Sequence, residues 1–201
     1  MALKLNIIIG STRPGRFGPV IAEWLSEAAA EHGKFAAELV DLADFDLPLL
    51  DEAAHPATRQ YANEATKRWS ASVASADAFL FVTPEYDYFA PAALVNAVQV
   101  LLHEWLYKPA GVLSYGGVSG GLRSAQVLRQ LLSNVNVHAL PQVVPVHFFQ
   151  QFIDDGGFRP SKQIQDGVND MLDGLHKWAR ALRTIRAEQA AVSAPQGAAA
   201  A

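Results

Sequence analysis

Residues 10–18 read GSTRPGRFG and directly follow an apolar run. The segment offers the hydroxyls of Ser11 and Thr12 and the guanidiniums of Arg13 and Arg16 where a helix is expected to begin. Fork-shaped charged donors and oriented backbone N–H groups at a helix N-terminus suit a terminal phosphate dianion. The segment lacks both the Gly-Lys-Ser/Thr of a Walker A loop and the second glycine of a dinucleotide loop. It predicts a phosphate site; a solvated arginine loop that only caps the helix is the alternative.

Two further segments combine unusual residues after apolar runs. Residues 84–88 read PEYDY, with two carboxylates and two tyrosines, and residues 116–121 read GGVSGG. Tyrosines could wall a flat ring, and glycines allow the backbone to approach a ligand closely. A turn with packed tyrosines and a plain flexible turn are the alternatives. Together the two segments predict a site for a flat, partly polar group.

Segments rich in β-branched and aromatic residues alternate with segments of helical period, which implies βαβ crossovers and a parallel sheet covered on both faces. The expected strands are Leu5–Ile9, Ala36–Leu42, Ala78–Val82, Ala110–Ser114 and Val143–His147. The expected helices are about Gly18–Glu31, Thr58–Ser75, Pro91–Leu106, Leu122–Asn134 and Ser161–Ala187. Ligands of such sheets bind beyond the carboxyl ends of the strands. The three segments described above are therefore expected to meet at one edge of the sheet.

The chain has 201 residues, of which 50% are hydrophobic and 18% charged, a composition that favours one globular domain. We expect this domain to span residues 1–186. Residues 187–201 are rich in alanine and are expected to form a flexible tail.

Charge and residue types exclude several functions. The net charge is −4 without a dense basic cluster, which argues against a nucleic-acid partner. No apolar run approaches the roughly 20 residues of a membrane span. The chain has no cysteine, so disulfides and thiolate chemistry are excluded, and a cytoplasmic location is expected. His103, His138 and His147 share no metal-binding spacing, and no metal is expected. The acidic cluster at residues 41–52 is interpreted as a solvated loop, with a ribose contact from Asp41 as the alternative.

The motifs GSTRPGR, PEYDYFAPAALVNAV and SYGGVSGGLRSAQVLRQLL occur in this order and together resemble the NADPH-dependent FMN reductase family. The similarity runs from about Leu5 to Trp178. It implies a flavodoxin-like α/β three-layer sandwich with a five-stranded parallel sheet of order 2-1-3-4-5. It also implies non-covalent FMN, NADPH or NADH as co-substrate, and a flavin, quinone, azo compound or metal oxyanion as the small acceptor. The family further implies homodimers or homotetramers with the flavin close to a subunit interface.

The resemblance assigns the site residues by position. It implies no catalytic side chain, because the bound flavin carries the chemistry. The first motif would hold the FMN phosphate through Ser11, Thr12, Arg13, Arg16, Phe17 and Gly18. The second would border the isoalloxazine and ribityl chain through Pro84, Glu85, Tyr86 and Asp87. The third would line the pyrimidine end of the ring through Tyr115, Gly116, Gly117, Ser119, Gly120 and Gly121.

The sequence departs from the family at several positions. Asp87 stands where asparagine is usual, Phe89 where a small or polar residue is usual, and Val95 and Gln99 replace a lysine and an aspartate. Phe17 replaces a small or polar residue near the phosphate. Phe89 and the pair Phe148-Phe149 could narrow the opening of the site and favour flat apolar acceptors such as quinones. An FMN-binding electron carrier or a redox-responsive binding module with little turnover is the alternative function.

The helix expected from Pro91 to Leu106 carries two apolar stripes, which predicts that it is buried on two faces. One stripe comprises Leu94, Val98, Leu101 and Trp105, and the other comprises Val95, Leu102 and Leu106. We expect the second stripe to contact another subunit. Cover by the following loop or by the final helix is the alternative.

Overall fold

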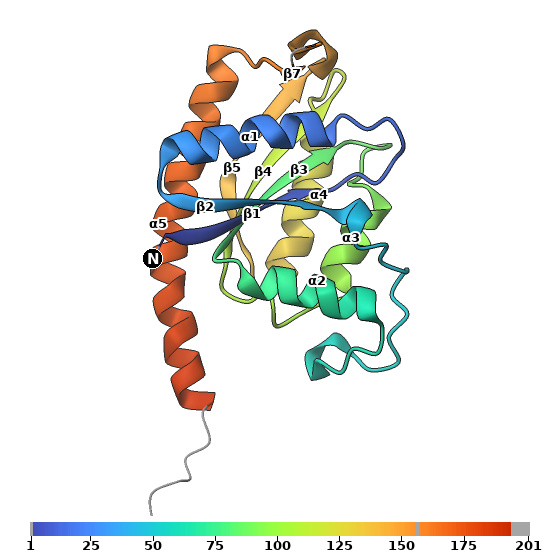
Figure 1. The fold of residues 1–201 in the computed structure, drawn as a ribbon, viewed down its shortest axis with the longest axis vertical. Helices are drawn as coiled ribbons and strands as arrows, with labels where there is room; N and C mark the ends of the chain where they lie inside the picture. The colour runs from blue at the N-terminus through green and yellow to red at the C-terminus, as the bar shows by residue number, and fades with distance from the viewer. Residues whose placement is uncertain (1, 156, 194–201) are drawn as a thin grey trace, which may run out of the picture.

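A computed structural model describes residues 2–155 and 157–193, and its centre is a five-stranded sheet (Figure 1). The strands run in parallel in the order β2-β1-β3-β4-β5. Their bounds are β1 Leu3–Ile9, β2 Phe35–Asp41, β3 Ala78–Pro84, β4 Pro109–Gly116 and β5 His138–His147. The predicted flavodoxin-like sheet and its strand order are confirmed.

Helices cover both faces of the sheet. One face packs against α1 (Gly18–His32) and α5 (Lys162–Ser193). The other packs against α2 (Glu64–Ser75), α3 (Ala92–Gln99) and α4 (Leu122–Asn134). The central strand β3 is buried along its whole length because both of its faces are covered, as its unbroken apolar run predicts.

Short elements complete the described chain. A small antiparallel pair, β6 (Ile153–Asp154) and β7 (Gly157–Phe158), follows the main sheet. The 3-10 turns are η1 (Leu42–Asp44), η2 (Pro56–Thr58) and η3 (Phe149–Phe152). Within the described ranges, no helix is long and apolar enough to cross a bilayer.

The prediction of a helix from Pro91 to Leu106 is wrong in its second half. The helix α3 ends at Gln99, and Trp105 is fully buried beyond it. The Trp105 indole donates to the Val98 carbonyl at 3.1 Å, which is the acceptor that the N–H of Leu102 would use in a continuing helix. Leu102 packs against the chain's own core. The second apolar stripe therefore does not form the continuous exposed face on which the predicted subunit contact depended.

Two other helix bounds differ from the predictions. The helix α2 begins at Glu64 instead of Thr58, because Arg59 has a left-handed backbone (φ +54°) and the Glu52 carboxylate accepts from the N–H of Ala62 (2.7 Å) and Asn63 (3.1 Å). Glu52 thus orders the chain before this helix, which corrects its interpretation as part of a solvated loop. The helix α5 continues to Ser193, past its predicted end near Ala187. Residues 194–201 of the predicted tail lie outside the described residues.

Candidate active site

The three predicted segments meet at the carboxyl ends of β1, β3 and β4, where they surround a cavity of about 410 Å³. This convergence is expected of an open parallel sheet. The cavity is lined by Arg13, Gly15, Arg16, Phe17, Pro84, Glu85, Tyr86, Tyr115, Gly116, Gly117, Phe149 and Gln150.

The first segment places its two arginines in different surroundings. Arg13 is exposed and has no ion-pair partner among residues 2–155 and 157–193. Arg16 is largely buried, and its guanidinium lies 2.5 Å from Asp41 Oδ2. The Nε of Arg16 is buried without a hydrogen-bond partner in the described protein. A buried charged donor without a partner is costly, so this nitrogen is available to an anionic ligand.

The helix α1 begins directly behind these arginines. Gly18 is its first residue and is buried, and a β-carbon there would lie 2.9 Å from the Ile9 side chain and 3.3 Å from the Tyr115 hydroxyl. The first turn of a helix leaves backbone N–H groups without helical partners, and these groups favour anions. Glycine therefore lets this electropositive helix end pack closely against the site.

Three aromatic rings form one wall of the cavity. The Phe149 ring contacts Phe17 edge-on at 5.2 Å and Tyr115 edge-on at 5.1 Å, both between ring centroids. Burial, with a smaller effect of Tyr86, raises the pKa of Tyr115 well above its ordinary value. Tyr115 is therefore a neutral, packed wall at physiological pH.

The second segment turns sharply at its tip. Tyr86 and Phe89 exchange two backbone hydrogen bonds of 3.0 Å, and the residues between them, Asp87 (φ +48°) and Tyr88 (φ +75°), have left-handed backbones. Asp87, Tyr88 and Phe89 are exposed and do not line the cavity, whereas Tyr86 does. The Tyr86 hydroxyl lies 2.7 Å from the buried Ser11 Oγ and so connects the first two segments.

Glu85 connects the second segment to the third. Its carboxylate accepts from Ser119 Oγ (2.8 Å), from the Arg123 N–H (3.2 Å) and from the Arg123 guanidinium (2.9 Å). Burial acts to raise the pKa of Glu85, but these hydrogen bonds and the charge of Arg123 together hold it below its ordinary value. The Arg123 guanidinium also lies over the Tyr88 ring, 4.0 Å from its centroid. Glu85 is therefore an ionised structural tie between two loops.

The glycines of the third segment have distinct roles. Gly121 (φ +78°) leaves no room for a β-carbon, which would lie 2.7 Å from the Tyr115 nitrogen. Gly120 (φ +60°) packs against the His147 ring. A β-carbon on Gly117 would meet nothing within 4 Å, and the Gly117 carbonyl accepts from the N–H of Phe148 at 3.1 Å. The loop is thus fixed at its far end and open to the cavity at Gly117.

Several predicted residues lie beside the cavity and not in its lining. Thr12 lines a neighbouring cavity of about 330 Å³ together with residues of η1. Ser119 and Gly121 stabilise the third loop, because Ser119 bonds Glu85 and also accepts from the Gly121 N–H at 3.2 Å. Asp41, for which a ribose contact was the alternative, instead pairs with Arg16 and accepts from the Ala43 N–H at 3.0 Å.

Three residues of the site were not predicted: Gly15 and Gln150 line the cavity, and Arg123 holds Glu85. Phe149, predicted to narrow the opening, lines the cavity, and Asp41, considered for a ribose contact, holds Arg16. Two sequence signals could have indicated them: Arg123 lies two residues after Gly121, and Gln150 lies three residues after the end of β5.

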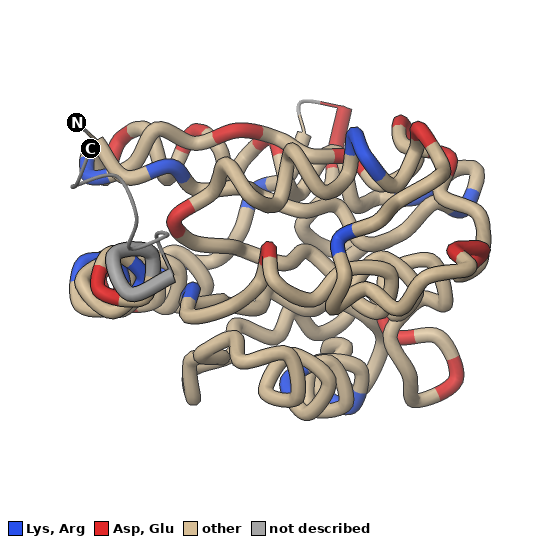
Figure 2. The backbone as a smooth tube through the Cα atoms, turned by 90° about the horizontal axis from the view of Figure 1, so that it is seen from below, with Lys and Arg blue, Asp and Glu red and all other residues tan. Residues whose placement is uncertain are grey.

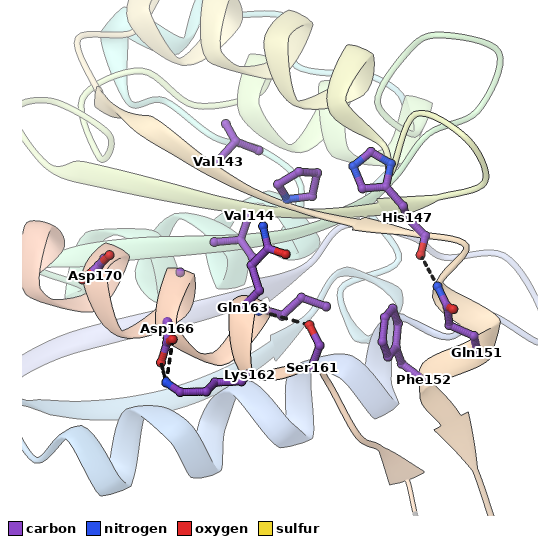
Figure 3. A pocket seen from close by; sticks show the side chains of 13 residues that line it. Val143, Val144, His147, Gln151, Phe152, Ser161, Lys162, Gln163, Asp166 and Asp170 are labelled. Atoms are coloured by element: carbon purple, nitrogen blue, oxygen red, sulfur yellow. Dashed lines mark hydrogen bonds and ion pairs between the residues drawn. The ribbon is translucent and has the colours of Figure 1, made fainter.

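A larger cavity of about 680 Å³ lies along β5 and the start of α5 and contains none of the predicted residues. Figure 3 shows its rim, where Gln151 donates to the His147 carbonyl at 3.0 Å and Lys162 pairs with Asp166 at 2.7 Å. The turn η3 separates it from the candidate site, since Gln150 lines one cavity and Gln151 the other. Its lining lacks the combination of arginines and glycines found in the site.

Comparison with known proteins gives matches over most of the chain. A family model described as NADPH-dependent FMN reductase matches residues 3–151. An NAD(P)H-dependent FMN reductase of Schizosaccharomyces pombe is 42% identical over 126 residues, which are 62% of this chain and 63% of the relative. A quinone reductase of Pseudomonas putida is 33% identical over 135 residues, which are 64% of this chain and 69% of the relative.

A solved structure shares the fold. The flavoenzyme NAD(P)H:(acceptor) oxidoreductase FerB of Paracoccus denitrificans superposes with a TM-score of 0.70 at 20% identity, covering 90% of this chain and 98% of FerB. The sheet order, the three converging loops and the match over residues 3–151 agree, and the chain belongs to the NADPH-dependent FMN reductase family.

Proposed function

We propose that the protein is an FMN-dependent oxidoreductase that takes reducing equivalents from NAD(P)H and passes them to a small acceptor. One observation carries the proposal: an unpaired arginine and a helix N-terminus adjoin an open glycine loop and an aromatic wall in one cavity. FMN combines a terminal phosphate with a flat ring, and this donor set offers partners to both.

The phosphate end of FMN fits the first segment. Within the described protein, exposed Arg13 has no ion-pair partner and the buried Nε of Arg16 has no hydrogen-bond partner. Together with the first backbone N–H groups of α1, these groups provide charge-assisted donors for a dianion. Asp41 offsets part of the Arg16 charge, so Arg13 provides the larger share of the attraction.

The ring end fits the second and third segments. Tyr86, Glu85 and the backbone at Gly116 and Gly117 border the cavity where no side chain occupies the space. Among the described residues, the N–H groups of Gly117 and Val118 make no hydrogen bond. These amides are available to orient the polar edge of a ring and to stabilise negative charge there.

Bound FMN supplies the hydride chemistry between nucleotide and acceptor. The chain's own residues bind and orient it, and no side chain acts as acid or base: Glu85 is committed to Ser119 and Arg123, and Tyr115 keeps its proton. Quinones and flavins are the proposed acceptors, as the names of the relatives suggest. The aromatic residues Phe17 and Phe149 favour flat apolar molecules at this site.

A homo-oligomer is part of the proposal, and exposed apolar side chains near the site support it. These side chains, which come from the second and third segments and the end of β5, are Tyr88, Phe89, Val118, Leu122 and Phe148. Clustered exposed apolar groups are typical of subunit interfaces. A dimer formed through this rim would place the site near the contact. The cytoplasmic location expected from the lack of cysteine stays a prediction.

Steady-state assays test the proposal. Protein supplemented with FMN is expected to oxidise NADPH or NADH when a quinone is present, and the rate should depend on both additions. Omission of FMN from apoprotein is the control. Protein that binds FMN but oxidises neither nucleotide would be a flavin-binding electron carrier.

A further inference from the structure

A second concave site lies at the opposite end of the sheet from the candidate active site. It is a groove of about 400 Å³, called the basic groove here, lined by Ala2, Leu3, Lys34, His176, Arg180 and Arg183. Leu3 begins β1, whereas the active site lies beyond the last residue of that strand, Ile9. Seven residues of strand separate the two sites by roughly 20 Å. The basic groove therefore has no part in the chemistry proposed above.

The cations of the basic groove come from two separate parts of the chain. His176, Arg180 and Arg183 on α5 are spaced i, i+4 and i+7 and so share one face of the helix. Lys34 precedes β2. The start of β1 lies beside α5 (Figure 1), and Figure 2 shows several Lys and Arg positions at the end of the molecule that carries the N mark. Folding thus gathers charges that are dispersed in the sequence.

Little negative charge compensates these cations. Among residues 2–155 and 157–193, Arg180 and Arg183 have no ion-pair partner, whereas Arg186 on the same helix pairs with Asp77 at 2.8 Å. Asp173, beside the groove lining, is shared between Lys34 (2.5 Å) and His32 (3.2 Å). The whole chain has more acidic than basic residues, so this local excess does not follow from composition.

His176 reports the positive potential of the basic groove. Burial lowers the pKa of His176. The charges of Lys34 and Arg180, with a smaller effect of His32, lower it further, and Asp173 opposes them. A group whose charged form is disfavoured by neighbouring cations regains a proton more easily when an anion binds beside it. His176 is therefore a local probe of occupancy.

We propose that the basic groove binds a small soluble anion that carries two or more phosphate groups. Arginine side chains form paired hydrogen bonds with phosphate oxygens, and Lys34 adds a mobile point charge. The concave shape and the volume of about 400 Å³ fit a compact ligand better than a flat macromolecular surface. Leu3 and Ala2 add a small apolar border for the group that bears the phosphates.

Inorganic triphosphate is the probe for the test, and the ring signals of His176 in NMR spectra are the local readout. Assignment comes from the loss of these signals in His176→Asn. Triphosphate is expected to bind saturably and to raise the pKa of His176 by at least about 0.5. The double variant Arg180→Gln/Arg183→Gln should weaken binding at least about tenfold. Circular dichroism verifies that this variant remains folded, since both side chains are exposed.

Two matched controls locate the effect. Lys177→Gln removes an exposed cation of α5 outside the groove lining, and Arg13→Gln removes the unpaired arginine of the other site. In both variants, the triphosphate affinity measured from the His176 signals should stay within about twofold of that of the original protein. The measurement needs no flavin and no turnover, so its failure is distinct from a failure of the proposed oxidoreductase activity.

Three results would overturn the proposal. The first is a His176 signal that does not move with triphosphate at millimolar concentration. The second is an equal loss of triphosphate affinity in Lys177→Gln and in the double variant, which would indicate attraction to the general surface charge. The third is binding to vesicles that contain phosphatidic acid without binding of soluble triphosphate, which would assign the cations to a membrane surface.

Discussion

Arg13 and Arg16 lie three residues apart but provide different electrostatics. Asp41 neutralises much of the Arg16 charge, while Arg13 is solvated and free of ion pairs within the described ranges. An exposed cation costs little to keep unpaired, whereas Arg16, whose side chain is only 20% exposed, gains from a counter-charge. Arg16 is thus held in place, and Arg13 is the arginine whose charge a phosphate can neutralise.

Changing Arg13 to Ala should weaken FMN binding by about 1.5–3 kcal/mol, the usual value of a hydrogen bond to a charged group. Riboflavin lacks the phosphate, so its affinity should change little. Fluorescence titration of the apoprotein with both ligands measures the difference, and Arg129→Ala on α4, outside the cavity lining, serves as the control. Equal losses for FMN and riboflavin would show that Arg13 does not contact the phosphate.

Asp87 stands where the family usually has asparagine, and its backbone conformation explains why this change is tolerated. Its φ of +48° lies in the left-handed region, which asparagine and aspartate tolerate better than most residues. The exchange of asparagine for aspartate therefore preserves the turn between Tyr86 and Phe89. Tyr88 is less well suited to its φ of +75°, and the Arg123 guanidinium stacked on its ring stabilises the turn from outside.

At the scale of elements, the loop between β4 and α4 combines a rigid end with an open end. Gly121 begins the helix with a left-handed backbone in close contact with Tyr115, whereas Gly117 faces free space. The same residue type therefore serves two purposes within one loop, at positions four residues apart. One glycine fixes the loop, and the other leaves room for a ligand.

Gly121→Ala should destabilise the fold by about 2–4 kcal/mol, because it combines a left-handed alanine with a steric clash. Gly117→Ala has open space and should change the unfolding free energy by no more than about 0.5 kcal/mol, while weakening flavin binding. Urea denaturation compares the two variants. Similar stability of both would mean that the loop relaxes freely at Gly121.

Lys108 links two elements far from the site. This buried lysine lies at the start of β4 and donates to the carbonyls of Val73 (2.7 Å) and Ala74 (3.1 Å) at the end of α2. Burial, with a smaller effect of Arg186, lowers the pKa of Lys108 to about 7 from an ordinary 10.5. Between these two values the unfolded chain binds more protons than the folded one, so stability must rise with pH in this window.

The unfolding free energy should therefore increase by at least about 1 kcal/mol between pH 7 and pH 9. Below pH 7, Lys108 is protonated in both the folded and the unfolded chain. Its contribution to the unfolding free energy is then constant and at its most destabilising. Urea denaturation across the pH range measures the slope, and Lys108→Met should flatten it. A slope unchanged in Lys108→Met would assign the effect to other groups.

Sequence patterns predicted the five strands, because a strand buried on both faces reads as an unbroken apolar run, as in β3. The order of the strands was implied by the family resemblance and is confirmed. The predicted helix bounds were wrong where one side chain forms the hydrogen bond that a backbone group would form in a continuing helix. The Trp105 indole ends α3 and the Glu52 carboxylate sets the start of α2. Both interactions join segments outside one helical turn, so local patterns carry no record of them.

In the candidate site, too, some features could be predicted from the sequence and others could not. The motifs predicted which loops meet, since their carboxyl-end positions follow from the order of the strands. They did not predict the ties between loops, such as the pairing of Arg16 with Asp41 or of Glu85 with Arg123. These pairs depend on side-chain directions that only the folded sheet determines.

At the scale of the whole molecule, exposed apolar groups gather near the site. Val118 is 71% exposed and Phe148 is 54% exposed, and their segments are joined by the hydrogen bond from the Phe148 N–H to the Gly117 carbonyl. Leu102, by contrast, packs inside the chain. We therefore expect a subunit interface at this exposed rim. The second apolar stripe of the predicted helix, which includes Leu102, is not expected to contribute to it.

Val118→Lys should lower the solution mass to that of the monomer or shift the equilibrium at least about tenfold toward it, because a buried unpaired charge is costly at an interface. Ile185→Lys on α5, also at an exposed apolar residue, is the matched control and should leave the mass unchanged. Light scattering after size exclusion measures both variants. An assembly that withstands Val118→Lys would place the contact elsewhere.

The central claim is that the cavity binds FMN in a form that NAD(P)H can reduce. The most direct measurement mixes FMN-loaded protein with NADPH, and separately with NADH, in the absence of oxygen, and follows the visible absorbance of the flavin. We expect rapid bleaching with at least one nucleotide and return of the colour when a quinone is added. Protein shown to hold FMN that stays yellow with both nucleotides would contradict it.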